Sequence, residues 1–65
     1  MLKVNGIETA AAGKSIRELV EEGGYRCDMI AVERNEEIVP KTQYDTTIAQ
    51  DGDVIEIVQF MGGGR

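Results

Sequence analysis

An Asn-Gly step between two short alternating segments fixes how the first part of this chain folds. Residues 2–4 and 7–9 each alternate apolar with polar side chains, and Asn5-Gly6 lies between them. A two-residue hairpin loop of type I′ needs positive φ at both central residues, a conformation that Asn and Gly adopt readily. The sequence therefore predicts a β-hairpin over residues 2–9.

A short amphipathic helix is predicted after the hairpin. Ser15 and Glu18 have the spacing of a capping box, in which each side chain bonds a free backbone N–H at the helix start. One apolar stripe follows at helical spacing: Ile16, Leu19 and Val20. Gly23-Gly24 is expected to end the helix. Because the helix is short, it depends on docking its stripe against a sheet.

The remaining strands are predicted from two later segments. Residues 29–39 indicate a strand, a turn near Asn35-Glu36 and a second short strand that stops before the only proline. Residues 41–50 are polar and mixed, so we expect an irregular crossover with at most one helical turn. Asp51-Gly52 then turns the chain into the most apolar and β-branched strand, residues 53–60.

This order of elements favours one mixed β-sheet with the helix across one face, because a hairpin alone cannot bury the helix stripe. The last strand suits a central position beside the first. We predict an α+β, ubiquitin-like β-grasp fold over residues 1–61, followed by a glycine tail over residues 62–65. The predicted core consists of apolar residues from every element: Leu2, Val4, Ile7, Ile16, Leu19, Val20, Ile30, Val32, Ile55 and Ile57.

Size, charge and composition exclude several functional classes. Sixty-five residues suffice for one domain but not for a deep cleft between two lobes. A net charge of −5 with scattered cations disfavours nucleic acid and suits partners with basic surfaces. No apolar run is long enough to span a membrane, and the amino terminus lacks a signal-peptide pattern. We expect a cytoplasmic protein that is monomeric when free.

Side chains suited to catalysis are scarce. The chain has no histidine and one cysteine, so a zinc site or a Cys–His pair cannot be assembled. Cys27 is expected to be a partly buried apolar residue ahead of a strand. Gly13-Lys14-Ser15 resembles the end of a P-loop, but Glu8 stands where that motif needs its first glycine. We expect no enzyme activity, no metal and no bound cofactor.

The last strand presents two different faces. Ile55 and Ile57 share one face, and the other face carries Val54, Glu56, Val58 and Phe60. Since a glutamate does not readily face a small core, the isoleucines should pack under the helix. Phe60 then has two interpretations. Either it folds back over the edge of the core, or it joins Val58 and the neighbouring Met61 as an exposed anchor for a partner.

The carboxyl terminus reads Gly62-Gly63-Gly64-Arg65. Such a segment can be a frayed end without consequence. Alternatively, a chain without Cβ atoms can thread a narrow channel and present a terminal carboxylate to chemistry inside another protein. A carboxylate is a poor acyl donor until its oxygen becomes a good leaving group. This second interpretation therefore requires a partner that adenylates the carboxylate with ATP, after which the acyl group can receive sulfur.

Two segments, VERNEEIVPK at 32–41 and DGDVIEIVQFMGGG at 51–64, resemble the ThiS family of sulfur carrier proteins of thiamine biosynthesis. The similarity extends to the hairpin NG and to KSIRELV in the helix. The resemblance implies a carrier without catalysis of its own. Its C-terminal glycine is adenylated by a ThiF-like adenylyltransferase and converted to a thiocarboxylate. The sulfur then passes to a ThiG-like thiazole synthase for the thiazole ring.

Carried onto this sequence, the resemblance assigns the terminal diglycine to Gly63 and Gly64, with the thiocarboxylate on Gly64. Gly62 and Gly63 would thread the channel, and ATP and a sulfur donor would be used by the partner enzyme. Arg65 departs from the family pattern, because the Gly64 carbonyl lies in an amide while Arg65 is present. We expect a protease to remove Arg65. It could also be a remnant of how the protein was produced, or mark a variant that works differently.

Other functions remain open on the chemistry alone. A carrier of another sulfur pathway, such as the molybdopterin type, needs the same activated glycine, and so does a modifier that is joined to lysines of other proteins. A β-grasp module that binds partners without covalent chemistry is the alternative of a different class. Its binding would survive mutation of the glycines.

Overall fold

The computed structural model describes residues 1–60. The elements follow one another as β1 (Leu2–Val4), β2 (Ile7–Thr9), α1 (Ile16–Glu22), η1 (Cys27–Met29), β3 (Ile30–Arg34), β4 (Glu37–Val39), η2 (Lys41–Gln43) and β5 (Val54–Gln59). The predicted order of hairpin, helix, strand, short strand, crossover and strand is therefore confirmed.

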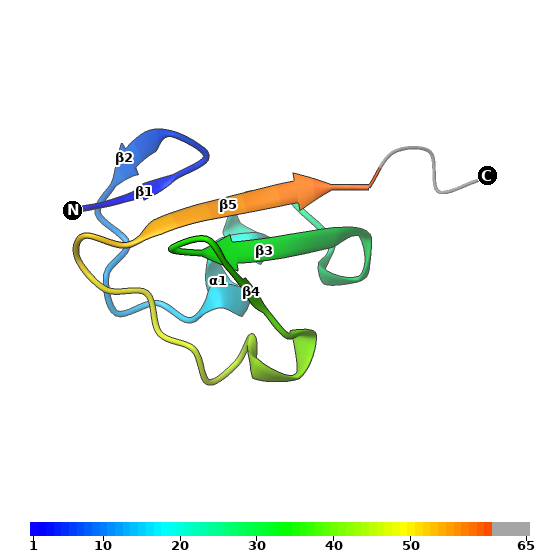
Figure 1. Ribbon diagram of the computed structural model, residues 1–65. Coiled ribbons are helices and arrows are strands. Elements are labelled where there is room, and N and C mark those ends of the chain that lie inside the picture. Colours follow the sequence, from blue (N-terminus) through cyan, green and yellow to red (C-terminus); the bar gives the residue numbers. More distant parts are fainter. Residues whose placement is uncertain (61–65) are drawn as a thin grey trace.

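All strands join one five-stranded sheet in the order β2-β1-β5-β3-β4. The central strand, β5, runs parallel to β1 and antiparallel to β3. The helix α1 lies behind the sheet in Figure 1 and covers one face of it. This mixed sheet with one helix across one face is the ubiquitin-like β-grasp fold that the sequence predicted.

The amino-terminal hairpin has the predicted loop. Asn5 and Gly6 have φ values of 52° and 82°, and β1 pairs with β2 in the register Val4↔Ile7. The carboxamide of Asn5 also has a long-range role, because its Oδ1 accepts a hydrogen bond of 2.7 Å from the backbone N–H of Ile57. A side chain thus occupies the position at which a further residue of β1 would bond β5.

The helix begins and ends as its sequence predicts. The backbone N–H of Glu18 donates to Oγ of Ser15 at 3.1 Å, and the backbone N–H of Ser15 donates to Oε1 of Glu18 at 2.9 Å. These two bonds complete the capping box. After the helix, Gly24 takes a positive φ of 83° and turns the chain away.

Most of the predicted core is confirmed. The predicted residues that are buried are Leu2, Ile16, Leu19, Val20, Ile30, Val32, Ile55 and Ile57. Val4 is only half-buried at the margin of this cluster. The core also contains residues that the sequence did not predict, all of them outside β1, β2, α1, β3 and β5: Ala11, Val39, Tyr44 and Ala49.

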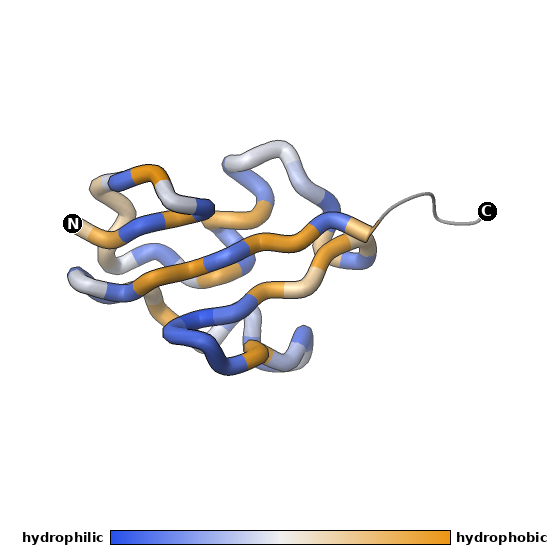
Figure 2. The backbone as a smooth tube through the Cα atoms, turned by 45° about the horizontal axis from the view of Figure 1, so that its top comes forward, coloured by the Kyte–Doolittle hydropathy of each residue, from blue (hydrophilic) through white to orange (hydrophobic). Residues whose placement is uncertain are grey.

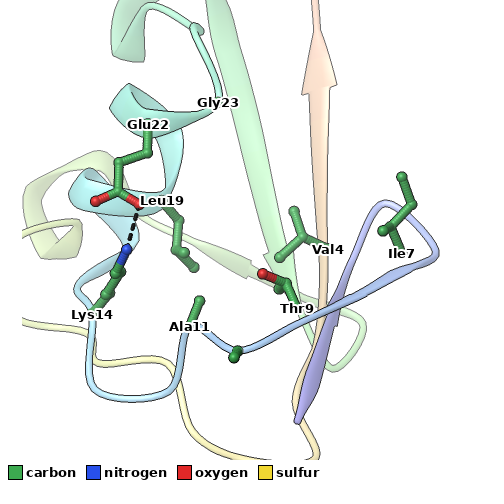
Figure 3. A pocket seen from close by; sticks show the side chains of 9 residues that line it. Val4, Ile7, Thr9, Ala11, Lys14, Leu19, Glu22 and Gly23 are labelled. Atoms are coloured by element: carbon green, nitrogen blue, oxygen red, sulfur yellow. Dashed lines mark hydrogen bonds and ion pairs between the residues drawn. The ribbon is translucent and has the colours of Figure 1, made fainter.

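The prediction for Ile7 is wrong, because its side chain is 70% exposed. Ile7 lies on β2, the edge strand, where no helix covers the sheet. An open groove of about 290 Å³ separates the hairpin from α1. Figure 3 shows Val4 and Leu19 inside this groove and Ile7 at its far end, on the same face of the hairpin as its partner Val4 but beyond the reach of the helix. The alternation that gave Ile7 its inward orientation says nothing about how far the helix reaches.

Two residues outside the regular helix and strands also pack against the core. Cys27 is half-buried in η1, directly before β3, as predicted. Tyr44 follows η2 and is 2% exposed. Burial raises the pKa of the Tyr44 hydroxyl above its usual value. The crossover that carries Tyr44 therefore covers one end of the core, although its sequence shows no periodic pattern.

Candidate docking surface beside the glycine tail

The two faces of β5 differ sharply in exposure. Ile55 and Ile57 are 0% and 7% exposed beneath the helix, whereas Val58 and Phe60 are 52% and 49% exposed on the opposite side. In Figure 2 most of β5 has the apolar colour, and because successive residues of a strand face opposite sides, both of its faces carry apolar side chains. The predicted assignment of the two faces is confirmed. Phe60 is exposed and is not part of the core.

We define the outer face as the exposed side of β5, β3 and β4, which carries Ala31, Glu33, Ile38, Val54, Glu56, Val58 and Phe60. Strand register brings these side chains together. In the pairing of β3 with β5, Val58 lies opposite Ala31. In the pairing of β3 with β4, Glu33 lies opposite Ile38. Phe60 stays in line with the strand, because its N–H donates to the carbonyl of Met29 at 2.9 Å. The outer face is thus apolar at the end of β5 that leads to the tail.

Two carboxylates lie in the middle of the outer face. Glu56 is directly opposite Glu33 in the β3–β5 register. Within residues 1–60, neither glutamate takes part in an ion pair. Like charges that face each other across two strands destabilise the sheet slightly. This arrangement gives the outer face a negative centre beside its apolar end, a combination suited to an apolar partner surface with basic residues.

A buried carboxylate fixes the other end of β5. Oδ2 of Asp53 accepts hydrogen bonds from Nε of Arg34 at 2.8 Å and from the N–H of Gln50 at 2.9 Å, and its Oδ1 accepts one from Nδ2 of Asn35 at 3.1 Å. Burial by itself raises the pKa of Asp53. These hydrogen bonds, with the charge of Arg34, outweigh burial and hold the pKa below its usual range.

Sequence reasoning missed this network. Asn35 adds a further bond to the central strand, because its Oδ1 accepts from the N–H of Val54 at 2.9 Å. The turn between β3 and β4 is therefore tied to the start of β5 by side chains of both regions. The only signal in the sequence was an Asp and an Asn at the ends of predicted strands, where such residues commonly bond nearby backbone groups.

The residues that resemble the end of a P-loop serve the fold. Nζ of Lys14 forms an ion pair with Oε1 of Glu22 at 2.6 Å, as the dashed line in Figure 3 shows. Ser15 is occupied by the capping box. Neither side chain is free to meet a phosphate in this arrangement.

The described part of the chain offers no metal site and no membrane-spanning helix. Residues 1–60 contain no group of three or more His, Cys, Asp and Glu side chains placed to hold a metal ion. None of the helices in this range is long and apolar enough to cross a membrane. The outer face offers exposed apolar and acidic side chains, whose chemistry is that of binding.

The remaining predicted site residues lie outside the described residues. These are Met61, Gly62, Gly63, Gly64 and Arg65. The described chain reaches them through Phe60, the residue that follows β5. The exposed pair Val58 and Phe60 is therefore adjacent in sequence to the glycines.

Comparison with known proteins gives a consistent result. The model of the ThiS family matches residues 2–64 of the chain. The sulfur carrier protein ThiS of Bacillus subtilis is 38% identical over 66 residues, which cover 98% of this chain and all of the relative. A solved crystal structure of a thiamine biosynthesis protein (ThiS) from Geobacter metallireducens superposes with a TM-score of 0.79 at 34% identity, covering 97% of each chain.

A second group of relatives is much longer. The thiazole synthase of Paramagnetospirillum magneticum is 45% identical over 64 residues, which cover 97% of this chain but 20% of that protein. The thiazole synthase of Magnetococcus marinus is 38% identical over 56 residues, or 17% of its length. The chain thus spans about a fifth of the length of the thiazole synthases that it matches.

Proposed function

The chain belongs to the ThiS family, and on that premise we propose that it is a sulfur carrier for the thiazole moiety of thiamine. Gly64 is the acceptor of the sulfur, once its carbonyl carries a free carboxylate. The chain is a carrier and co-substrate for partner enzymes and has no catalysis of its own. It works in the cytoplasm and is monomeric when free.

The observation that carries this proposal is a match that reaches the glycines. The family model extends to Gly64, and the ThiS relative of Bacillus subtilis is covered over its whole length. The folded body supports the same function, because the central strand leads from the core to the tail and leaves apolar side chains exposed beside it. Curated relatives that carry the name sulfur carrier protein favour the thiamine pathway over the other sulfur pathways.

The chemistry follows from the weak reactivity of a carboxylate. A carboxylate oxygen of Gly64 attacks the α-phosphorus of ATP, pyrophosphate leaves, and an acyl-adenylate forms. A sulfide-level sulfur donor then attacks the carbonyl carbon, AMP leaves with the bonding electron pair and the sulfur loses its proton, which yields a thiocarboxylate. A ThiF-like adenylyltransferase would bind the ATP and use the sulfur donor, so the carrier needs no bound cofactor. Gly62 and Gly63 would allow the tail to enter the active site without a Cβ clash.

The second partner of the proposed cycle is a ThiG-like thiazole synthase. Support comes from the longer relatives, in which about a fifth of a protein named thiazole synthase matches this chain. A carrier segment within the same polypeptide as its acceptor enzyme is expected if the two meet in each reaction cycle. Val58, Phe60 and the adjacent Met61 would dock these partners beside the tail.

Arg65 must be absent for this cycle. The peptide bond between Gly64 and Arg65 removes the carboxylate that attacks ATP, and the carboxylate of Arg65 itself brings a long side chain to the reacting position. We propose that a protease removes Arg65 before activation.

Intact mass tests the proposal directly. A chain ending at Gly64 is incubated with a ThiF-like adenylyltransferase, ATP and a sulfur donor, and it should gain the mass difference between sulfur and oxygen. The same chain without ATP, and the chain that keeps Arg65, serve as controls and should keep their mass. The proposal fails if the chain ending at Gly64 is not converted. The proposed removal of Arg65 fails if the longer chain is converted equally fast.

A further inference from the structure

The first strand stops before the central strand does. β1 pairs with β5 only at Lys3↔Val54 and Val4↔Ile55, whereas β3 pairs with β5 as far as Gln59. In Figure 1 the hairpin of β1 and β2 accordingly flanks only one end of β5, and β5 continues past it toward the carboxyl terminus. The second half of β5 therefore has a strand neighbour on one side only.

The direction of each backbone group follows from the observed hydrogen bonds. Lys3 and Asn5 donate to the carbonyls of Asp53 and Ile55, both at 2.9 Å, so odd-numbered residues of this region point toward β1. The N–H of Phe60 donates to the carbonyl of Met29, the residue just before β3, and so points to the opposite side. Successive backbone groups of a strand alternate in direction. Ile57 and Gln59 therefore turn their N–H and C=O groups toward the side where β1 has ended.

Only one of these groups is used within the described part of the chain. The N–H of Ile57 is bonded by the Asn5 carboxamide. Among residues 1–60, no hydrogen bond engages the C=O of Ile57 or the N–H and C=O of Gln59. We call this stretch, residues 57–59, the open edge.

The open edge also lacks the protection found on the two outer strands of the sheet. Free strand edges attract other strands, and proteins commonly blunt them with charged residues. The outer strands β2 and β4 carry Glu8 and Glu37. The open edge reads Ile-Val-Gln and carries no charge. It is the uncharged edge of this sheet, and it lies directly before the segment that reaches the glycines.

We propose that the open edge binds an extended segment of the enzyme that processes the tail, as an added strand of the sheet. This inference rests on the proposed function and adds how the partner holds the carrier. Backbone pairing with Ile57 and Gln59 aligns the chain independently of side-chain identity. It fixes the direction in which the following residues leave the sheet. The glycines are therefore oriented toward the active site of the bound enzyme.

Proline substitution tests the pairing. Gln59→Pro removes an N–H that the fold does not use and puts a ring where the added strand would lie. In a chain ending at Gly64, this variant should bind a ThiF-like adenylyltransferase at least about tenfold more weakly, a factor that corresponds to one lost hydrogen bond. Its melting temperature should stay near that of the parent. The matched control is Glu8→Pro on β2, which should bind as the parent does.

Glu8 is a suitable control because its N–H also points away from the sheet. Lys3, which lies opposite Glu8, directs its own N–H toward Asp53, so this pair exchanges no hydrogen bonds between β1 and β2. Both variants thus place a proline at a free strand edge. They differ in whether that edge lies beside the tail.

Amide hydrogen exchange provides a measurement without mutation. The N–H of Gln59 should exchange fast in the free chain and become protected in the complex. This measurement decides the matter if Gln59→Pro lowers stability. The inference is overturned if Gln59→Pro binds as tightly as Glu8→Pro, or if the Gln59 amide still exchanges fast in the complex. In that case the parent chain would still be converted to the thiocarboxylate, whereas failure of the proposed function would abolish conversion in every variant.

Discussion

The inner and outer faces of β5 differ in what covers them, although both carry apolar side chains. On the inner face, Ile55 and Ile57 are enclosed by the helix and the neighbouring strands. On the outer face, Val58 and Phe60 stay about half exposed, although they are just as apolar. Burying the outer side chains as well would need a second covering element, which a chain of 65 residues does not supply.

The outer face also accepts an arrangement that the inner face would not. Glu33 and Glu56 lie opposite each other there, and neither forms an ion pair within residues 1–60. On the inner face, an unpaired charge would be strongly destabilising. The comparison indicates that packing determines the inner face, whereas the outer face is free of that requirement and can serve the proposed docking of partners. Each of the following changes tests that division.

Gly63→Val should have the largest effect, and it should affect neither face. In a chain ending at Gly64, the branched side chain should block entry of the tail and slow thiocarboxylate formation by about a hundredfold or more. The melting temperature should not change, because the described core ends at Ile57. Intact mass after a timed reaction gives the rate, and conversion at the parental rate would contradict the proposed use of the glycines.

Leu19→Ala tests the inner face. Leu19 is a buried member of the core cluster, so its truncation should lower the free energy of unfolding by about 2–5 kcal/mol. Chemical denaturation measures this loss. Ile7→Ala is the matched control, since Ile7 is exposed and its truncation should cost about 0.5 kcal/mol or less. Equal losses in the two variants would show that the groove side of the hairpin is packed as tightly as the core.

Phe60→Ala tests the outer face. Loss of an exposed aromatic anchor should weaken binding to a ThiF-like or ThiG-like partner by about 2 kcal/mol or more and change stability little. Titration calorimetry with the partner and thermal melting of the free chain report the two effects separately. Ile7→Ala again serves as a control, because it removes an exposed apolar side chain far from the tail. A lower melting temperature with unchanged affinity for the partner would show that Phe60 stabilises the fold and does not anchor a partner.

Asp53→Asn tests the network at the start of β5. It replaces a carboxylate that accepts bonds from Arg34, Gln50 and Asn35, and should cost about 1–2 kcal/mol of stability near pH 7. Since the folded state lowers the pKa of Asp53, this contribution is complete above its unfolded pKa of about 3.9 and is lost as pH falls through the folded pKa.

The variant should therefore lose less stability than the parent on acidification below about pH 4. Unfolding by urea at a series of pH values measures this difference. Parallel pH profiles of parent and variant would show that the network does not depend on the charge of Asp53.

Glu56→Gln should have the smallest effect. It should raise the stability of the free chain but lower the rate of association with a partner. Removing one of two facing carboxylates should raise the free energy of unfolding of the free chain by about 0.2–1 kcal/mol. It should at the same time slow association with a partner of basic surface, most clearly at low salt. Stopped-flow binding at two ionic strengths tests the second effect. A variant that is more stable and binds the partner equally fast would show that the facing glutamates do not contribute to docking.

Much of the fold could be predicted because its signals are local. The hairpin loop depends on positive φ at Asn5 and Gly6, the helix start on the reciprocal bonds of Ser15 and Glu18, and the faces of β5 on a period of two residues. Each of these is decided by residues a few positions apart. The same periodicity correctly assigned Val58 and Phe60 to the exposed side of the sheet, and so located the described part of the candidate docking surface.

The features that the sequence did not determine depend on how far each element extends over its neighbours in the folded protein. Ile7 is exposed because α1 does not extend over the edge strand, while Tyr44 is buried because an irregular crossover folds back over the core. The Asp53 network and the facing pair of Glu33 and Glu56 join residues far apart in the chain. The open edge beside Gln59 exists only because β1 ends before β5 does. Local hydrogen bonds and side-chain period set each element, but only tertiary packing decides their overlap.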